Sequence, residues 1–234
     1  MTRQTTIVLV GPPAVGKSTQ ATILASELKA RGYRVRAAKT SSFVLLKHTR
    51  PLMLILSKMF VWRRRNASPP RILLESPSVF RGLFKLWLLA DILLVHARFL
   101  LQVYVPWKLG YSIIIEFDWF CWLAIYFHLR RSLGLPSSHI DLDRAVGLLH
   151  LVQPKRILLL DAEEGALESR WNRRDSRANI AEMRECLHIL RSLALPLASA
   201  LHTDLVRVNS GNPSQTSRNI LQALSDLFSD TTVD

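Results

Sequence analysis

The chain has 234 residues, of which 49% are hydrophobic, and it carries a formal net charge of +13. This composition excludes an intrinsically disordered protein, and the length suits one α/β domain with a substantial core over residues 1–234. The two cysteines, Cys121 and Cys186, match no zinc or redox spacing, so we expect buried, reduced thiols in the cytoplasm. Because the first residues are predicted to lead directly into a strand, we expect no signal peptide.

The positive charge is concentrated in one stretch of the chain. No acidic residue lies between Glu27 and Glu75, whereas lysines and arginines recur throughout that stretch. Three interpretations are open: a solvated basic face, a surface that contacts an anionic membrane, or a site for a phosphate-rich partner such as nucleic acid. The membrane interpretation rests on the apolar and aromatic residues that lie between the charges. No nucleic-acid-binding motif supports the third interpretation.

The hydrophobic pattern predicts alternating strands and helices. In chain order these are a strand at 5–10, a helix at 17–31, a strand at 33–38, helical apolar segments at 43–62 and 79–105, a strand at 111–117, helices at 119–132 and 139–149, a strand at 156–160, helices at 163–174 and 178–194, a strand at 205–208 and a last helix at 214–228. Gly32 is expected to cap the first helix, and Pro51 to kink or break the second. The alternation indicates a parallel sheet with helices on both faces.

The two long apolar segments raise the question of a membrane-spanning helix. Residues 83–107 are long enough to cross a bilayer, but they include Lys85, Asp91, His96 and Arg98. Charges near the bilayer centre are unfavourable, and residues 51–62 are too short, so we expect no spanning helix. Two alternatives stay open: packing on the sheet and against a partner subunit, or a peripheral amphipathic contact with a membrane.

Residues 11–19, Gly-Pro-Pro-Ala-Val-Gly-Lys-Ser-Thr, fit the P-loop pattern G-x-x-x-x-G-K-[ST] at every fixed position. An apolar strand precedes them and a helix follows, which is the context that the motif requires; a chance match within a Gly/Pro turn is the alternative. Glycines let the backbone N–H groups point at phosphate oxygens, and the helix N-terminus adds partial positive charge. The residues expected to bind the nucleotide are Gly11, Pro12, Ala14, Val15, Gly16, Lys17, Ser18 and Thr19.

Within this motif we expect Lys17 to reach the β- and γ-phosphates of ATP, and Ser18 to bind Mg²⁺. Together with the alternating elements, the motif predicts a three-layer P-loop NTPase fold, in which a five-stranded parallel sheet has helices on both faces.

Acidic residues follow two of the predicted strands. Asp118 comes directly after the third strand, where P-loop enzymes hold Mg²⁺ and its waters, and is the candidate metal ligand beside Ser18. Glu116 is the alternate, because residues two positions apart share a face of a strand. A surface turn for Asp118 and a structural ion pair for Glu116 remain alternatives. After the fourth strand, Asp161 and Glu163 are assigned mainly to capping of the next helix.

The helix after the fourth strand continues into an arginine-rich segment. Helical spacing predicts that four arginines gather on one side: Arg170, Arg173, Arg174 and Arg177. Arginine donates paired hydrogen bonds to phosphate and neutralises charge during phosphoryl transfer, so these arginines join Lys17 as catalytic candidates. An exposed helix end is the alternative. The turn at 208–214, which contains Gly211, offers a place where a purine base could pack.

The order of these parts resembles the thymidylate kinase family of nucleoside monophosphate kinases over almost the whole chain. The resemblance rests on the P-loop motif at 11–19, the third strand with Asp118, the segments Ile-Leu-Leu-Leu-Asp at 157–161 and Ala-Leu-Glu-Ser-Arg at 166–170, the arginines up to Arg177, and residues 208–213. It implies an ATP-dependent kinase with Mg²⁺, commonly a homodimer. It also implies that Arg170 packs near the adenine and that a lid near 170–178 carries Arg173, Arg174 and Arg177. Asp118 looks like the Asp of the family's Asp-Arg-[Tyr/His] motif.

The chain departs from this family on the acceptor side. Trp119 follows the Asp where the family has Arg, and Lys39-Thr40-Ser41-Ser42 replaces the family's Thr-Arg-Glu-Pro. Ile92 stands where the family has the arginine that meets the acceptor base. Because an acceptor phosphate needs paired cationic donors, these losses indicate a changed acceptor. Lys39 or Arg98 are candidate substitutes.

Three functions follow as expectations. The first is a kinase that moves the γ-phosphoryl of ATP to an unidentified acceptor, either a nucleoside monophosphate or a more hydrophobic, membrane-presented substrate. The second is a non-catalytic nucleotide-binding switch that signals to a partner or a membrane. The third is thymidylate kinase activity with a rebuilt acceptor site.

Overall fold

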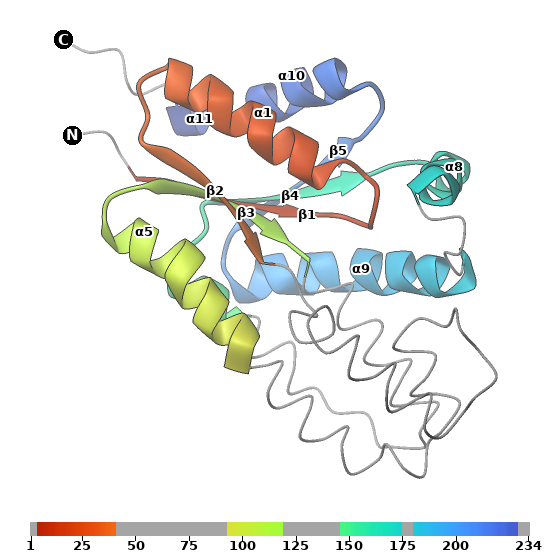
Figure 1. Ribbon diagram of the computed structural model, residues 1–234, viewed down its shortest axis with the longest axis horizontal. Coiled ribbons are helices and arrows are strands. Elements are labelled where there is room, and N and C mark those ends of the chain that lie inside the picture. Colours follow the sequence, from red (N-terminus) through yellow and green to blue (C-terminus); the bar gives the residue numbers. More distant parts are fainter. Residues whose placement is uncertain (1–3, 41–92, 119–145, 175–179, 229–234) are drawn as a thin grey trace, which may run out of the picture.

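Five strands form one parallel sheet in the order β2-β3-β1-β4-β5. The computed structural model describes residues 4–40, 93–118, 146–174 and 180–228, and Figure 1 draws the others in grey. The strands are β1 (Thr6–Val10), β2 (Val35–Thr40), β3 (Ser112–Phe117), β4 (Arg156–Asp161) and β5 (Asp204–Asn209). The helices predicted at 43–62 and 119–132, Pro51, and the side chains of both cysteines lie outside the described residues.

Helices cover both faces of this sheet. They are α1 (Lys17–Ala30), the π-helical turn η1 (Leu100–Tyr104), α5 (Val105–Lys108), α8 (Glu164–Arg174), α9 (Ile180–Ala200), α10 (Pro213–Ala223) and α11 (Ser225–Phe228), with further helical residues at 93–99 and 146–150. Figure 1 shows α1, α10 and α11 on one face, and α5 and α9 on the other. The predicted α/β class, with a five-stranded parallel sheet covered on both faces, is confirmed. In the described part of the chain, no helix combines the length and the apolar character needed to cross a membrane.

Several element boundaries differ from the prediction. β2 begins at Val35 rather than residue 33, because the N–H groups of Gly32 and Tyr33 bond to the carbonyls of Lys29 and Leu28 and still belong to the end of α1. The helix predicted to end at residue 105 continues to Lys108, because the π-helical turn η1 already interrupts the regular bonding just before Pro106. α9 extends to Ala200 with Pro196 inside it, and the last helix is divided between α10 and α11.

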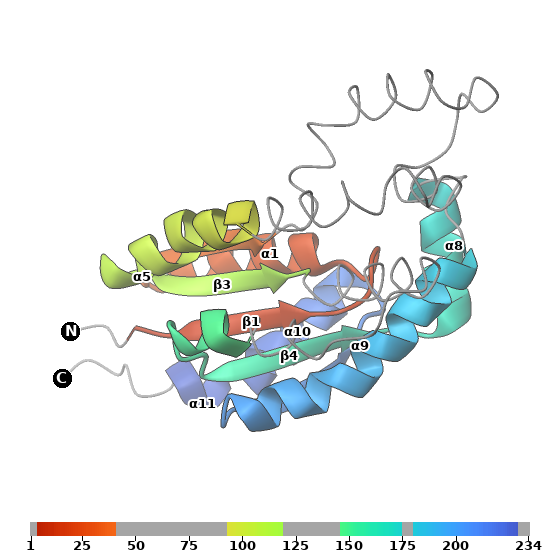
Figure 2. The same cartoon turned by 90° about the horizontal axis from the view of Figure 1, so that it is seen from below.

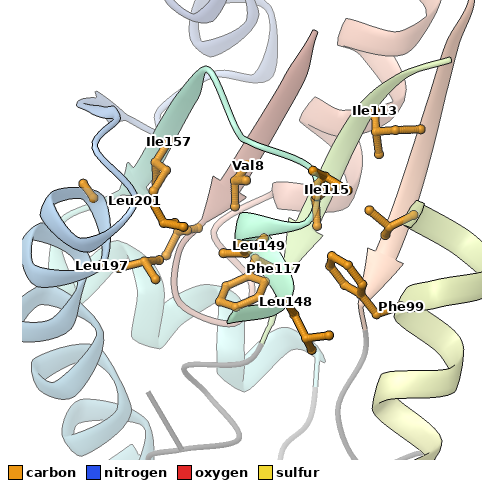
Figure 3. Packing of buried hydrophobic residues seen from close by; sticks show 14 of the residues in the cluster. Val8, Phe99, Ile113, Ile115, Phe117, Leu148, Leu149, Ile157, Leu197 and Leu201 are labelled. Atoms are coloured by element: carbon orange, nitrogen blue, oxygen red, sulfur yellow. The ribbon is translucent and has the colours of Figure 1, made fainter. Parts of the chain in front are cut away.

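Alternation along the strands divides the buried side chains between two cores. One cluster holds Val8 and Val10 of β1 with residues of α9 and of the helix that contains η1. The other holds Ile7 and Leu9 of β1 with residues of α1, α8 and α10. Figure 3 shows the first cluster, to which Phe99, Ile115 and Phe117 belong. All five β1 residues are buried, as expected for the central strand of a parallel sheet.

The chain changes direction next to β1. From β1 it passes through α1 on one face and reaches β2, beyond β3; from β4 it passes through α8 and then α9, on the opposite face, to reach β5. The connections that leave the carboxyl ends of β1 and β4 therefore diverge to opposite faces. In an open parallel sheet such a point leaves a crevice at the carboxyl edge, which is where ligands bind.

An ion pair fastens the C-terminal helices to the amino end of β4. The guanidinium of Arg156 contacts both carboxylate oxygens of Asp226, at 2.7 and 2.8 Å, and also Asp204 Oδ2 at 3.3 Å. It also donates to the carbonyl of Ala223 at the end of α10. The hydrogen bond from Arg156 holds the pKa of the Asp226 carboxyl below its ordinary value of 3.8.

Replacement of Asp226 by asparagine should reduce the acid sensitivity of folding. Because the folded pKa lies below the unfolded one, this carboxylate stabilises the fold above about pH 4, and the contribution is lost as the pH falls through the folded pKa. Urea unfolding measured at several pH values should show a smaller loss of unfolding free energy in acid for D226N than for the wild-type protein. Identical pH profiles would show that the pair contributes nothing.

Candidate functional site

Residues 11–16, which we call the motif loop, connect β1 to α1 at the carboxyl edge of the sheet. The loop lies close against β4: a Cβ atom built on Gly11 would come within 2.6 Å of the carbonyl oxygen of Leu160 and 2.8 Å of Val15 Cγ1. Gly16 has a φ of 101° and Ala14 a φ of 61°, both in the left-handed region. The loop therefore needs glycine at two positions and tolerates a strained alanine between them.

Lys17, the first residue of α1, points its amine back over the motif loop. Nζ donates to the carbonyls of Gly11 at 2.6 Å and Pro12 at 3.0 Å, and lies 3.1 Å from Asp118 Oδ1. The Lys17 side chain is only 7% exposed, so its ammonium has lost most of its water. These three oxygen atoms take the place of that water. The cation is thus fixed at the carboxyl end of the central strand.

The two candidate carboxylates, one on β3 and one directly after it, contact different residues of the motif. Glu116 Oε2 accepts a hydrogen bond of 2.6 Å from Ser18 Oγ, whereas Asp118 pairs with Lys17. Glu116 lies on the α1 face because its neighbours Ile115 and Phe117 belong to the core on the opposite face. Of the two carboxylates, the alternate Glu116 is therefore the one beside Ser18. The metal assignment of Ser18 and Asp118 stays a prediction.

Lys39 adds a second cation at this edge. In the pairing of β2 with β3, Lys39 lies opposite Glu116. Its Nζ is 3.9 Å from Glu116 Oε2 and 3.5 Å from Ser18 Oγ. Arg98, the other candidate substitute on the acceptor side, donates from Nε to Gln102 Oε1 one helical turn away. The structure thus brings Lys39 to the site. Trp119, Ile92 and residues 41–42 lie outside the described residues.

Two residues that the sequence did not single out contact the motif loop from the β4–β5 side. The indole Nε1 of Trp171, on α8, donates to the carbonyl of Pro13 at 2.6 Å. The hydroxyl of Ser210, just after β5, donates to the carbonyl of Val15 at 2.6 Å. Both side chains are buried. Ser210 could have been found from the sequence, because it follows a predicted strand and so lies at the same edge of the sheet. Trp171 could not, because its pattern indicates only a buried position on a helix.

The arginine-rich segment is described in part. Arg170 Nη2 donates to the carbonyls of Ser210 at 3.2 Å and Gly211 at 3.3 Å, so α8 and the turn at 208–214 are in contact. Arg173 is exposed and reaches Ser169 Oγ at 3.4 Å. The side chain of Arg174 and all of Arg177 lie outside the described residues, so the grouping of the four arginines stays a prediction. Figure 2 shows α8 beyond the carboxyl ends of the strands.

Asp161 has a different role from the capping that the sequence indicated. Its carboxylate accepts from Arg191 at 3.0 Å, Arg207 at 2.8 Å and the N–H of Ala162 at 2.9 Å. The hydrogen bond to Asp161 raises the pKa of the Arg191 guanidinium above its ordinary value. The capping interpretation was wrong for Asp161 because two arginines that are distant in sequence outcompete the local helix end. Glu163 contributes its backbone carbonyl, which accepts from Leu167 N–H.

A comparison with known protein families finds no family model that matches the chain, and no curated protein matches it. The chemistry of the site therefore follows from its own residues. Among the described residues no three His, Cys, Asp or Glu side chains gather into a metal cluster. A Mg²⁺ ion that arrives with nucleotide phosphates needs only one or two protein oxygens, and Ser18 and Glu116 present two that are adjacent.

Replacement of Gly11 by alanine should distort the motif loop. Any Cβ at this position meets the backbone oxygen of Leu160 at 2.6 Å, which β4 holds in place, so the loop itself must move. For ATP, the ligand that the sequence predicts for this loop, we expect affinity to fall by about tenfold or more, equivalent to at least about 1.4 kcal/mol. Equilibrium binding measures this. Gly165→Ala is the matched control, because nothing lies within 4 Å of its added Cβ; equal affinities for the two variants would contradict the prediction.

Proposed function

We propose that this chain is a P-loop nucleotide-binding protein that acts as an ATP-dependent phosphotransferase. The observation that carries the proposal is the buried Lys17 amine, held by Gly11 and Pro12 carbonyls at the carboxyl end of the central strand. A cation fixed over a glycine-containing loop at a helix N-terminus suits the β- and γ-phosphates of a nucleoside triphosphate.

The topology supports the same ligand site. The motif loop leaves β1 where the neighbouring connections diverge, so a ligand in the crevice meets the loop, the N-terminus of α1 and the ends of β3 and β4. Residues from both sides of β1 already converge there: Glu116, Asp118 and Lys39 from the β3–β2 side, and Arg170 from α8. In this proposal the sheet is that of a P-loop NTPase.

A bound Mg²⁺ would supply charge neutralisation at the β- and γ-phosphates, and Ser18 with Glu116 or Asp118 would hold it through oxygen atoms and water. The protein's own part is positioning. Lys17 stabilises charge on the transferred phosphoryl group, and the catalytic candidates Arg170, Arg173, Arg174 and Arg177 approach from α8 and the segment that follows it. Gly211, whose carbonyl accepts from Arg170, lies where we expect the adenine.

Lys39 is our candidate for recognition of the acceptor. It lies on the side of Ser18 away from α8, on β2, and its side chain is 44% exposed, so its ammonium is accessible to a ligand. A single ammonium binds an anion as a point charge and lacks the planar fork of an arginine. We therefore propose an anionic acceptor other than thymidine monophosphate.

A nucleotide switch is the second candidate, and one contact favours it. Asp118 pairs with Lys17 at 3.1 Å, so a γ-phosphate that binds Lys17 must compete with this ion pair and release the Asp118 carboxylate. Nucleotide-dependent release of a segment next to the γ-phosphate is a recurring switch mechanism. Such a protein would bind ATP without transferring the γ-phosphoryl group to an acceptor.

Replacement of Lys17 by alanine should weaken ATP binding by roughly 10- to 100-fold, because it removes charge-assisted hydrogen bonds to phosphate. Titration with ATP·Mg²⁺, followed by calorimetry, measures this, and transfer of labelled γ-phosphate to a panel of nucleoside monophosphates and other anionic acceptors then separates the two functions. Wild-type protein that does not bind ATP would refute the proposal. Binding without transfer to any acceptor would favour the switch.

Replacement of Lys39 by methionine should leave ATP binding within about twofold and raise the KM for the acceptor by about tenfold or more, because only the acceptor loses its cation. Lys155→Met is the matched control, since it removes the same exposed charge just before β4, at the amino edge of the sheet. The acceptor proposal fails if the two variants show the same KM for the acceptor in steady-state kinetics.

A further inference from the structure

The carbonyl groups of the motif loop point in two directions. Those of Gly11 and Pro12 turn to Lys17 Nζ. Those of Pro13 and Val15 turn the other way, to Trp171 Nε1 and the Ser210 hydroxyl, each at 2.6 Å. The second pair of donors belongs to α8 and to the residue after β5, neither of which the motif itself includes.

The two outer donors lie on the same side of the loop. Trp171 is adjacent in sequence to Arg170, whose guanidinium donates to the carbonyl of Ser210 at 3.2 Å. Ser210 is in turn fixed to the sheet, because its N–H donates to the carbonyl of Asp161 at 2.6 Å. Trp171 is 3% exposed and Ser210 is 6% exposed, so both donors are held in the core rather than at a mobile surface.

Planar trans peptides turn these contacts into an arrangement of N–H groups. All described peptide bonds are trans, and in a trans peptide the carbonyl of one residue points opposite to the N–H of the next. When the Pro13 and Val15 carbonyls face Trp171 and Ser210, the N–H groups of Ala14 and Gly16 face away from them. Both N–H groups therefore point away from α8 and the end of β5. On that opposite side of the loop, a phosphate could accept hydrogen bonds from them.

Ala14 lies between these two anchored peptides and is in a left-handed conformation with a φ of 61°. Such a conformation is uncommon for alanine and persists only where the surroundings hold it. The anchors on its two sides, Trp171 at the Pro13 carbonyl and Ser210 at the Val15 carbonyl, supply that restraint.

We infer that Trp171 and Ser210 are positioning residues that orient the Ala14 and Gly16 amides for phosphate, although neither side chain would touch the nucleotide. This inference rests on the proposed nucleotide-binding function. On this inference, triphosphate binding depends on α8 and on the end of β5, because residues outside the motif hold the loop in its binding conformation. Preorganised donors bind an anion more tightly because they need not be ordered during binding.

The test measures ATP·Mg²⁺ affinity for the full-length variants Trp171→Phe and Ser210→Ala, each of which removes one donor and keeps most of the packing. We expect each to weaken binding by roughly tenfold. Inorganic triphosphate, used as a competitor, should lose affinity by the same factor, because the amides meet phosphate and not the base.

Matched controls separate positioning from general stability. Trp107→Phe makes the same chemical change beside the opposite core, and Ser192→Ala removes a hydroxyl that bonds within α9. Thermal unfolding reports the loss of general stability in each variant and control, whereas only the two loop variants should lose affinity at a temperature where all four proteins are folded. If Trp171→Phe does not fold, Ser210→Ala decides alone.

Wild-type protein that fails to bind ATP would refute the proposed function. Wild-type binding with unchanged affinity in both variants, or a loss for ATP that inorganic triphosphate does not share, would overturn only the positioning inference.

Discussion

A buried ammonium group determines how the carboxyl edge of this sheet is arranged. Lys17 is nearly enclosed, and a charged amine in that position is stable only if oxygen atoms surround it. The Gly11 and Pro12 carbonyls and the Asp118 carboxylate provide those oxygens, which bends the first half of the motif loop toward the lysine. The second half bonds instead to Trp171 of α8 and to Ser210 after β5. The Lys17 charge thus joins the loop to the end of β3, and neutral donors join it to α8 and β5.

The same edge is divided into two halves by β1. Glu116, Asp118 and Lys39 reach it from β3 and β2, and they carry charge of both signs close to Ser18. Trp171 and Arg170 reach it from α8, and Ser210 reaches it from the end of β5; all three donate to backbone carbonyls. The first half is suited to ions and anionic groups that come and go, whereas the second is suited to holding a fixed shape. In the proposed phosphotransferase, the first half would meet the acceptor and the metal ion, and the second half would hold the loop in shape for ATP.

Features that depend on neighbours along the chain could be predicted from the sequence. Alternating strands and helices, the motif loop and its strand–loop–helix context are local, and the parallel sheet follows from them. Glu116 and Asp118 were recognised as a pair because two residues two apart share a strand face, but only the packing of Phe117 and Lys17 shows which carboxylate reaches Ser18. Asp161 was misread because its partners Arg191 and Arg207 lie 30 and 46 residues away. Trp171 could not be found, since its donor role depends on the position of a loop 158 residues earlier.

The outermost strands of the described sheet, β2 and β5, each carry charged residues. β2 contains Arg36 and Lys39, and β5 contains Asp204 and Arg207, whose side chains are exposed. A flat apolar strand at the edge of a sheet can pair through its backbone groups with a strand of another copy. Charged side chains at these positions disfavour such edge-to-edge pairing. We therefore expect Arg207, which binds the Asp161 carboxylate, also to oppose pairing of this edge with another copy, so that one residue contributes both to the fold and to its solubility.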